Sequence, residues 1–239
     1  MMVSAKDLQI KVFADGADMQ GILDMYANPD IQGFTTNPTL MRQAGVEDYE
    51  KFARELLEQI QDKPVSLEVF ADEFDEMERQ ALKIASWGKN VNVKIPITNT
   101  KGEKSAPLIK KLSAEGVVVN VTAMMTLEQV QDVADALDPN TGAIVSVFAG
   151  RIADTGLDPV PHMTEALNIL KSRPKAELLW ASPRELLNIF QADWMGCHII
   201  TVTNSLLAKL SLVGKDLDEY SRETVEMFYR DASSAGYTL

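Results

Sequence analysis

Cysteine and histidine are scarce in this chain of 239 residues. The single cysteine, Cys197, excludes an intrachain disulfide framework and is typical of a protein from a reducing compartment. The two histidines, His162 and His198, lie far apart in the sequence and form no spaced set of metal ligands with Cys197. We therefore expect no metal site of the cysteine and histidine kind.

Basic residues and long apolar runs are also lacking. The chain has 35 acidic against 23 basic residues and a net charge of -12, which argues against a nucleic-acid partner. Any anion that the protein binds must therefore be held by locally placed basic groups. Residues 1–10 contain Lys6 and Asp7 and no apolar run of signal-peptide length, and no 18 apolar residues occur together. We expect a cytoplasmic protein with no membrane partner.

Short runs rich in β-branched residues alternate with helical patterns along the chain, which indicates parallel strands joined by helices. The predicted strands are Ile10–Asp15, Gly33–Asn37, Val65–Ala71, Asn90–Pro96, Val117–Ala123, Ala143–Ile152, Glu177–Ser182 and His198–Thr203. The predicted helices include Asp48–Gln61, Asp75–Trp87, Ala106–Ala114, Leu127–Leu137, Pro161–Ser172, Arg184–Met195 and Ser205–Leu212. This α/β pattern predicts one (β/α)8 TIM barrel, with a doubly wound open sheet as the alternative.

One further helix is expected after the eighth unit, over about residues 216–235. Leu217, Tyr220, Val225 and Phe228 form a loose amphipathic pattern in it. Residues 1–239 would then form one barrel domain with this helix appended. The helix has no place in a minimal barrel, so it would cover a mouth of the barrel or dock on a neighbouring subunit.

Lys94 is the anomaly in the fourth predicted strand, Asn-Val-Asn-Val-Lys-Ile-Pro. Asn92 and Lys94 alternate with apolar residues, so both lie on one face of the strand. A buried lysine without a partner tends to lose its proton, and a neutral amine is the nucleophile that attacks carbonyl groups. The alternatives are an edge-strand lysine that opposes aggregation and a buried lysine paired with a carboxylate.

Polar residues recur at a spacing of two in neighbouring strands, although the strands of a closed parallel barrel are usually apolar. These residues would share the barrel interior near the carboxyl ends of the strands, where barrel enzymes build their active sites. They are Ser66 and Glu68, Asn92 and Lys94, Asn120 and Thr122, and Ser146 with Phe148; Asp15, Thr35, Asn37 and Ser182 join the same rim. Each alone is more often a satisfied buried group, but together they favour a functional network around one lysine.

These residues suit covalent carbonyl chemistry. A neutral lysine condenses with a ketone to an iminium, which accepts electrons when the neighbouring C–C bond breaks. Asp15 would take the proton from the hydroxyl whose carbon becomes an aldehyde, and Glu68 with Thr122 would manage the water of carbinolamine formation. The pKa of Glu68 should be raised if Lys94 is neutral and lowered if the two form an ion pair, and the sequence leaves both open.

Two arginines and a serine suit a phosphate group. Arg151 follows the sixth predicted strand, and Ser182 and Arg184 stand where the seventh strand meets its helix. A hydroxyl, helix amides and guanidinium groups could meet an oxyanion there. The alternative for Arg184 is an ordinary surface residue of a helix.

The chain resembles the transaldolase family over nearly its whole length. The resemblance is carried by Val93-Lys94-Ile95-Pro96, Thr35-Thr36-Asn37-Pro38 and Ser146-Val-Phe148-Ala-Gly150-Arg151-Ile152, and by Phe-Ala-Asp15, Leu-Glu68-Val, Asn120-Val-Thr122 and Ala181-Ser182-Pro-Arg184.

The resemblance implies a class I mechanism with no cofactor. Lys94 would form a Schiff base with a ketose phosphate, Asp15 would act as acid and base, and Glu68 and Thr122 would position the water. Asn37, Asn120 and Ser146 would hold the dihydroxyacetone hydroxyls with Thr35 and Phe148 nearby, while Arg151, Ser182 and Arg184 would take the phosphate. Family transaldolases move a dihydroxyacetone unit from sedoheptulose 7-phosphate to glyceraldehyde 3-phosphate, giving erythrose 4-phosphate and fructose 6-phosphate in the pentose phosphate pathway.

Alternatives within and beyond the family remain. Short members include fructose-6-phosphate aldolases, which release dihydroxyacetone and carry Gln, Leu and Tyr where this chain has Glu68, Asn120 and Phe148; these differences favour transfer. Pro183 and Trp180 depart from the family pattern, and an indole near the phosphate pocket would leave a modified sugar such as a sulfonated one as an alternative. A non-catalytic phosphosugar-binding barrel is a third interpretation. Short members often form decameric rings through the C-terminal helix, which implies a homo-oligomer.

Overall fold

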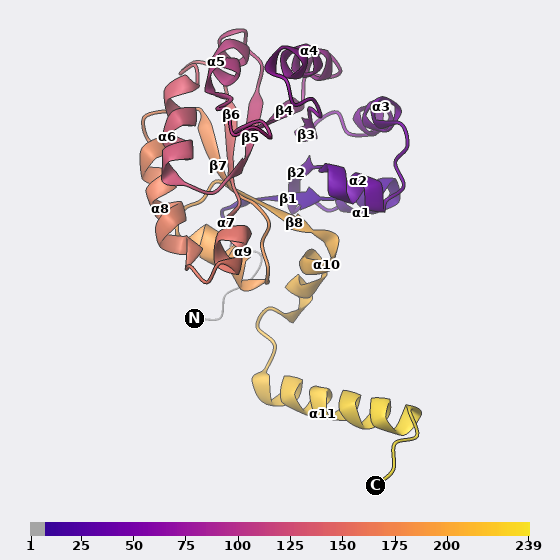
Figure 1. The fold of residues 1–239 in the computed structure, drawn as a ribbon. Coiled ribbons are helices and arrows are strands. Elements are labelled where there is room, and N and C mark those ends of the chain that lie inside the picture. Colours follow the sequence, from indigo (N-terminus) through magenta and orange to yellow (C-terminus); the bar gives the residue numbers. More distant parts are fainter. Residues whose placement is uncertain (1–7) are drawn as a thin grey trace.

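Eight parallel strands form a closed barrel in the order β1 to β8, and Figure 1 shows the helices arranged around them. The computed structural model describes residues 8–239. The strands are β1 (Lys11–Asp15), β2 (Ile31–Thr35), β3 (Val65–Glu68), β4 (Val91–Pro96), β5 (Val119–Met124), β6 (Ala143–Val147), β7 (Ala176–Trp180) and β8 (Ile199–Thr203). The closed order confirms the predicted (β/α)8 TIM barrel and contradicts the open-sheet alternative.

The helices follow the strands along the chain. They are α1 (Met19–Tyr26), α2 (Pro38–Gln43), α3 (Tyr49–Gln59), α4 (Phe74–Ala85), α5 (Ala106–Ala114), α6 (Leu127–Ala136), α7 (Ala149–Asp154), α8 (Pro159–Leu170), α9 (Leu187–Trp194), α10 (Asn204–Leu207), the 3-10 helix η2 (Ala208–Leu212) and α11 (Leu217–Ser234). Local side-chain caps fix several of their first turns. Asp48 caps α3, and Thr126 forms a capping box with Gln129 at the start of α6.

Three predicted boundaries are wrong in ways that matter for the site. The sixth strand, predicted over Ala143–Ile152, ends at Val147, and its remainder is α7. The second strand ends at Thr35, because Asn37 is already the N-cap of α2 with Pro38 at its first turn. The helix predicted over Arg184–Met195 begins only at Leu187.

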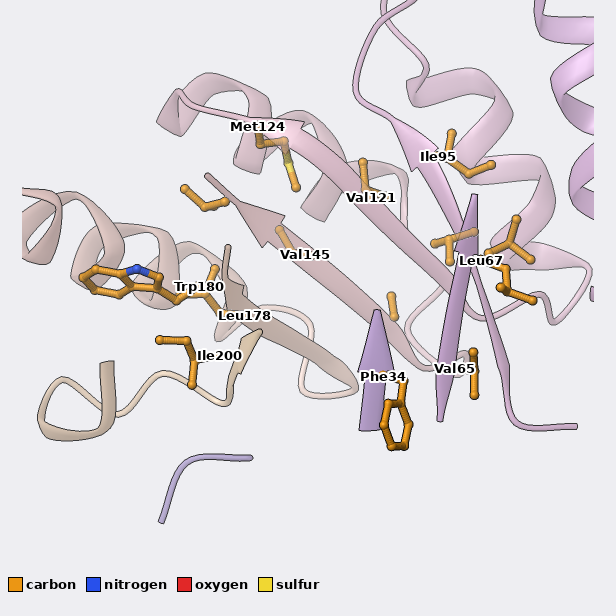
Figure 2. Packing of buried hydrophobic residues seen from close by; sticks show 14 of the residues in the cluster. Phe34, Val65, Leu67, Ile95, Val121, Met124, Val145, Leu178, Trp180 and Ile200 are labelled. Atoms are coloured by element: carbon orange, nitrogen blue, oxygen red, sulfur yellow. The ribbon is translucent and has the colours of Figure 1, made fainter. Parts of the chain in front are cut away.

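Two apolar layers make the core. The larger one lies between strands and helices, and Figure 2 shows part of it, with Trp180 beside Leu178 and Ile200. The smaller one fills the barrel interior and consists of Phe13, Ile144, Leu179, Ala181 and Ile199, with Phe148 packed against it. The apolar filling leaves the polar face of β3 to β5 as the part of the interior where chemistry can be placed.

Helix α11 stands away from the barrel in Figure 1. It begins at the N-cap Asp216, as expected, and none of its residues is buried. Its apolar side chains are exposed, with Leu217 at 79% and Phe228 at 62%. Residues 1–7 of the predicted domain lie outside the described residues. Among residues 8–239, no helix is both long enough and apolar enough to cross a membrane.

Candidate active site

Neighbouring strands bring the predicted polar residues together through their register. Glu68 pairs with Lys94, Lys94 with Asn120, and Asp15 with Thr35. All predicted site residues except Glu68 and Arg184 line one cavity of about 430 Å³, namely Asp15, Thr35, Asn37, Lys94, Asn120, Thr122, Ser146, Phe148, Arg151 and Ser182. This volume is that of a small-molecule site.

Lys94 and Glu68 lie side by side at the base of this cavity. Their side chains are 12% and 6% exposed, and Lys94 Nζ is 3.8 Å from Glu68 Oε2. That separation is longer than a hydrogen bond, and Nζ instead donates to the carbonyl oxygen of Thr36. Lys94 is therefore neither an edge-strand lysine nor directly hydrogen-bonded to the carboxylate beside it.

The pKa of Glu68 is raised, because burial outweighs the attraction of Lys94 and the hydrogen bond from Thr36. Its Oε1 atom has no hydrogen-bond partner among the described residues. Of the two directions that the sequence left open, the pKa is raised, and the cause is burial, with Lys94 acting in the opposite direction. The arrangement suits a carboxyl group that holds a proton until a reaction needs it.

Asp15 stands at the end of β1 and lines the same cavity as Lys94. Thr35 donates to Asp15 Oδ1 at 2.7 Å, and Asn37 Nδ2 lies 3.4 Å from Oδ2. Burial raises the pKa of Asp15, against the lowering effects of Lys94 and these hydrogen bonds. A carboxyl group with a raised pKa beside a nucleophilic amine is suited to take and return a proton.

Asn37 is held by the helix that it starts. Its Oδ1 accepts from Leu40 N at 2.9 Å, so the cap leaves Nδ2 to face Asp15 and the cavity. The pair Asn37-Pro38 thus begins α2 directly after β2, and it orients the side-chain amide of Asn37 toward Asp15.

A buried hydrogen-bond chain fixes the interior amide. Ser146 donates to Asn120 Oδ1 at 2.7 Å, and Asn120 Nδ2 donates to Ser66 Oγ at 3.1 Å. Every member has a partner, so the network is stable in the low-dielectric interior. It holds Asn120 and Ser146 in fixed orientations on the cavity wall.

Backbone strain occurs at two strand ends near the site. Ala123, next to Thr122, has φ of 65°, and Ser182 has φ of 58°. Such left-handed conformations are uncommon for residues other than glycine and are concentrated at functional sites. At Ser182 the turn interrupts the alternation of β7, so Ala181 and Ser182 both line the cavity.

Trp180 does not line the cavity beside Arg151 and Ser182, contrary to the expectation. Its side chain is fully buried between strands and helices, and it is absent from the cavity lining. Because Ser182 turns in the left-handed region, the alternation that would place Trp180 and Ser182 on one face is broken.

The two arginines lie in different surroundings. Arg151 lines the cavity, with its guanidinium over the Phe148 ring at 5.2 Å from the centroid. Arg184 does not line it, because Nε donates to Asp154 Oδ1 at 2.9 Å and Nη2 pairs with the other carboxylate oxygen. This ion pair lowers the pKa of Asp154. Arg184 stands between β7 and α9, as predicted, but its guanidinium is paired with Asp154 instead of lining the cavity.

Two threonines of the site were missed by sequence reasoning. Thr201 lines the cavity, with its Oγ1 2.5 Å from that of Thr35. The alternation in Ile-Ile-Thr-Val-Thr of β8 could have revealed it, by the same spacing of two. Thr36 is fully buried and touches both Lys94 and Glu68. Its neighbours Thr35 and Asn37 in Thr-Thr-Asn-Pro were singled out as site residues, but Thr36 was not.

Among residues 8–239, no three His, Cys, Asp or Glu side chains come together as a metal-binding group. The cavity and its base supply one amine, two carboxyl groups of raised pKa, several fixed hydroxyl and amide groups and one guanidinium. This set can attack a carbonyl, move protons and hold a sugar with an anionic end.

The chain is similar to known proteins over nearly its full length. The sequence profile described as Transaldolase/Fructose-6-phosphate aldolase matches residues 12–239. A probable transaldolase of Streptococcus equi subsp. zooepidemicus (strain MGCS10565) is 34% identical over 204 residues, covering 84% of this chain and 90% of that protein. A probable transaldolase of Thermoanaerobacter sp. (strain X514) is 32% identical over 232 residues, covering 96% of this chain and all of that protein, 100%.

Solved structures with low sequence identity share the fold. The 3-hexulose-6-phosphate synthase from Salmonella typhimurium has a TM-score of 0.55 at 15% identity, with 83% of this chain and 91% of that chain covered. KGPDC from Streptococcus mutans has a TM-score of 0.53 at 11% identity, with 81% and 86% covered. These likenesses show the barrel fold alone.

Proposed function

This chain belongs to the transaldolase and fructose-6-phosphate aldolase family, and from that premise we propose that it is a class I transaldolase of the pentose phosphate pathway. It transfers a dihydroxyacetone unit from sedoheptulose 7-phosphate or fructose 6-phosphate to glyceraldehyde 3-phosphate or erythrose 4-phosphate. The reaction proceeds in the cytoplasm through a Schiff base on Lys94 and uses no cofactor. The observation that carries the proposal is the Lys94 amine, whose side chain is only 12% exposed, 3.8 Å from Glu68 and lining the same cavity as Asp15.

The first step joins enzyme and donor. The unprotonated Lys94 Nζ attacks the C2 carbonyl of the ketose, the nitrogen loses a proton, and the oxygen gains one to give a carbinolamine. The hydroxyl then leaves as water with a proton from Glu68, and the nitrogen lone pair forms the iminium. The raised pKa of Glu68 supports its role as the proton donor, and Thr122, on the cavity wall, holds the departing water.

The second step breaks the carbon chain. Asp15 takes the proton of the C4 hydroxyl, its oxygen forms the aldehyde carbonyl, and the electrons of the C3–C4 bond pass to the iminium to give an enamine. The short aldose leaves, a longer or different aldose enters, and the same steps run backwards. Asn37, Asn120 and Ser146 hold the hydroxyls of the retained three-carbon unit, and Thr35 orients Asp15.

The anionic end of the sugar is bound by Arg151 and Ser182, which both line the cavity. Arg184 joins them only by leaving Asp154, since its guanidinium is committed to that carboxylate. Removing the charge of Asp154 therefore frees Arg184 for the phosphate. The choice between a phosphate and a sulfonate group is decided at these three residues and not at Trp180.

Transfer is favoured over release of free dihydroxyacetone by the residues that enclose the intermediate. Phe148 presents an apolar ring to the cavity, and no phenolic hydroxyl stands at that position to protonate the enamine. The enamine then survives until an aldose arrives. Glu68 and Asn120 are the other two positions at which this chain differs from the aldolase members.

A homo-oligomer formed through α11 accompanies this function. None of the residues of α11 is buried, and Leu217, Val225 and Phe228 are 79%, 63% and 62% exposed. A groove of about 370 Å³, lined by Ile10, Val12, Met25 and Leu207 among others, lies beside the short helix α10. The groove is far smaller than the 18-residue helix α11, so we propose that single apolar side chains of α11 from a second copy enter it.

The proposal is tested by supplying fructose 6-phosphate as donor and measuring both the products of transfer and the release of free dihydroxyacetone. With erythrose 4-phosphate present, the enzyme should form sedoheptulose 7-phosphate and glyceraldehyde 3-phosphate, and without an acceptor it should release little dihydroxyacetone. Lys94→Met should do neither. Release without acceptor at the rate of transfer would assign the chain to the aldolase branch, and inactivity with every sugar phosphate would favour a binding protein.

A further inference from the structure

Thr36 is a fully buried hydroxyl residue between β2 and β3, one position beyond the end of β2. A buried hydroxyl needs a hydrogen-bond partner, and this one has two acceptors within reach. Its Oγ1 lies 2.9 Å from Glu68 Oε2 and 3.0 Å from the carbonyl oxygen of Ser66. Since a hydroxyl carries one proton, it can donate to only one of the two at a time.

We propose that Thr36 is a positioning residue whose hydroxyl follows the proton of Glu68, so that this carboxyl can give up and regain a proton without losing its partner. The inference rests on the proposed function, in which Glu68 delivers a proton to the carbinolamine and takes one back in the reverse step. It assigns a role to a residue that does not itself line the cavity.

Rotation of the Thr36 hydroxyl hydrogen provides a hydrogen bond for both protonation states of Glu68. An ionised carboxylate only accepts hydrogen bonds, so Thr36 donates to Oε2. When Oε2 carries the proton, it donates to the Thr36 oxygen, and the Thr36 hydroxyl turns to the Ser66 carbonyl. The Ser66 carbonyl oxygen has two lone pairs. One of them accepts the backbone N–H of Thr36 at 3.3 Å, so the other can accept the Thr36 hydroxyl. In both states the Thr36 hydroxyl and Glu68 Oε2 are paired with each other, whereas Glu68 Oε1 has no partner among the described residues.

In this inference the proton is exchanged at Oε2 of Glu68. This oxygen lies 3.8 Å from Lys94 Nζ, the atom on which the carbinolamine forms. The Thr36 carbonyl accepts a hydrogen bond from that same Nζ. One residue therefore contacts the nucleophile through its backbone and the proton donor through its side chain. Changing the side chain leaves the first contact in place, which makes the two roles separable.

The other groups around Glu68 come from three elements. Lys94 of β4 attracts a charge on the carboxylate, and Asp15 of β1 repels it. Tyr49 of α3 donates to the Glu68 backbone carbonyl at 3.1 Å and not to its carboxyl group. Within residues 8–239, Thr36 is thus the one residue whose side chain donates a hydrogen bond to the Glu68 carboxyl, and the backbone N–H of Glu68 itself also favours the ionised form.

The test compares Thr36→Val, which keeps the shape and removes the hydroxyl, with Thr36→Ser, which keeps the hydroxyl. Thr36→Val should lower kcat by about ten- to hundredfold, the range for loss of a hydrogen bond to a charged group. The limb of its pH profile that disappears in Glu68→Gln should move to higher pH, because the ionised carboxylate has lost its donor. Thr36→Ser should restore most of kcat and the wild-type limb.

Two readouts separate this inference from a folding defect and from the proposed function. Borohydride reduction with fructose 6-phosphate should still label Lys94 in Thr36→Val, since the carbonyl that holds Nζ is unchanged. The infrared C=O stretch of protonated Glu68, assigned by its absence in Glu68→Gln, should persist to higher pH in Thr36→Val whether or not the wild type transfers sugars. An unmoved titration, a failure of Thr36→Ser to restore it, or loss of labelling in Thr36→Val overturns the inference. Absence of transfer by the wild type with a moved titration overturns the proposed function alone.

Discussion

Asp15→Asn should lower the activity without lowering the stability. Burial raises the pKa of Asp15, which suits this carboxyl group to proton transfer but also makes its ionised form destabilise the folded state. The amide cannot take the proton of the C4 hydroxyl. Loss of a general base typically costs about a hundred- to ten-thousand-fold in kcat, or about 2.7 to 5.5 kcal/mol of transition-state stabilisation at 1.36 kcal/mol per factor of ten. We expect a loss within this range.

Stability should move the other way. The Asn side chain keeps an oxygen for the 2.7 Å hydrogen bond from Thr35. It loses the attraction of Lys94 and the 3.4 Å contact with Asn37, of which the contact is worth at most about 1 kcal/mol. Against this loss, the variant no longer buries a carboxylate. Because burial raises the pKa of Asp15, the native state prefers the neutral form, and ionisation destabilises it as the pH rises through the native pKa.

The assay is a pair of thermal-unfolding curves at several pH values with activity measured in parallel. At neutral pH the Tm of Asp15→Asn should equal or exceed that of the wild type, and the difference should shrink as the pH falls below the unfolded pKa, about 3.9. Asp24→Asn is the matched control, since Asp24 is exposed and its side chain bonds only to Gln20 among the described contacts. A variant that keeps its activity, or that melts well below the wild type at neutral pH, would refute the reasoning.

Three further predictions address specificity, packing and assembly. Phe148→Tyr should raise release of dihydroxyacetone relative to transfer, because a phenolic hydroxyl could protonate the enamine, and an unchanged ratio of the two products would exclude Phe148 as the discriminator. Gly150→Ala should lower Tm by about 6 to 12 °C, from about 3 kcal/mol of overpacking at 2 to 4 °C per kcal/mol, because its Cβ would lie 1.5 Å from the Ser182 carbonyl oxygen; Gly142→Ala, with open space around it, is the control. Phe228→Asp should reduce the molar mass in sedimentation equilibrium to that of a smaller assembly, since Phe228 is 62% exposed on α11, and an unchanged mass would remove α11 from the interface.

The barrel and the base of the site were predictable because both depend on short-range periodicity. Parallel strands alternate their side chains with a period of two, and this placed Glu68, Lys94 and Asn120 on the interior face of β3, β4 and β5. The register between adjacent strands then places residues that lie at the same depth in the barrel next to one another. The capping box at Thr126 was predictable for a similar reason, since it involves residues only three positions apart.

The end of β6 could not be predicted from periodicity. Val147, Phe148 and Ala149 continue the apolar run of the strand into α7, and Phe148, the residue that precedes the helix, makes no side-chain cap hydrogen bond. With no Ser, Thr, Asp or Asn to mark the start, the strand and the six-residue helix read as one element. The turn was set by tertiary contacts, including Gly150 N donating to the Ala181 carbonyl.

The orientation of the Arg184 side chain depends on a partner 30 positions away, Asp154, the last residue of α7. Nothing in the local sequence of either residue specifies that pair, and an arginine after a strand looks the same whether it faces a ligand or a carboxylate. Trp180 was placed on the wrong side for a local reason, the left-handed turn at Ser182, which alternation alone does not reveal for a residue other than glycine.

The central claim is that Lys94 is the nucleophile, and reductive trapping tests it most directly. The enzyme is incubated with fructose 6-phosphate and borohydride, and its peptides are analysed by mass spectrometry, with Lys94→Met treated in parallel. The account predicts a reduced sugar adduct on the peptide that contains Lys94, loss of transfer in step with labelling, and no adduct in the variant. An adduct on another lysine, or transfer that continues undiminished without any adduct, would contradict it.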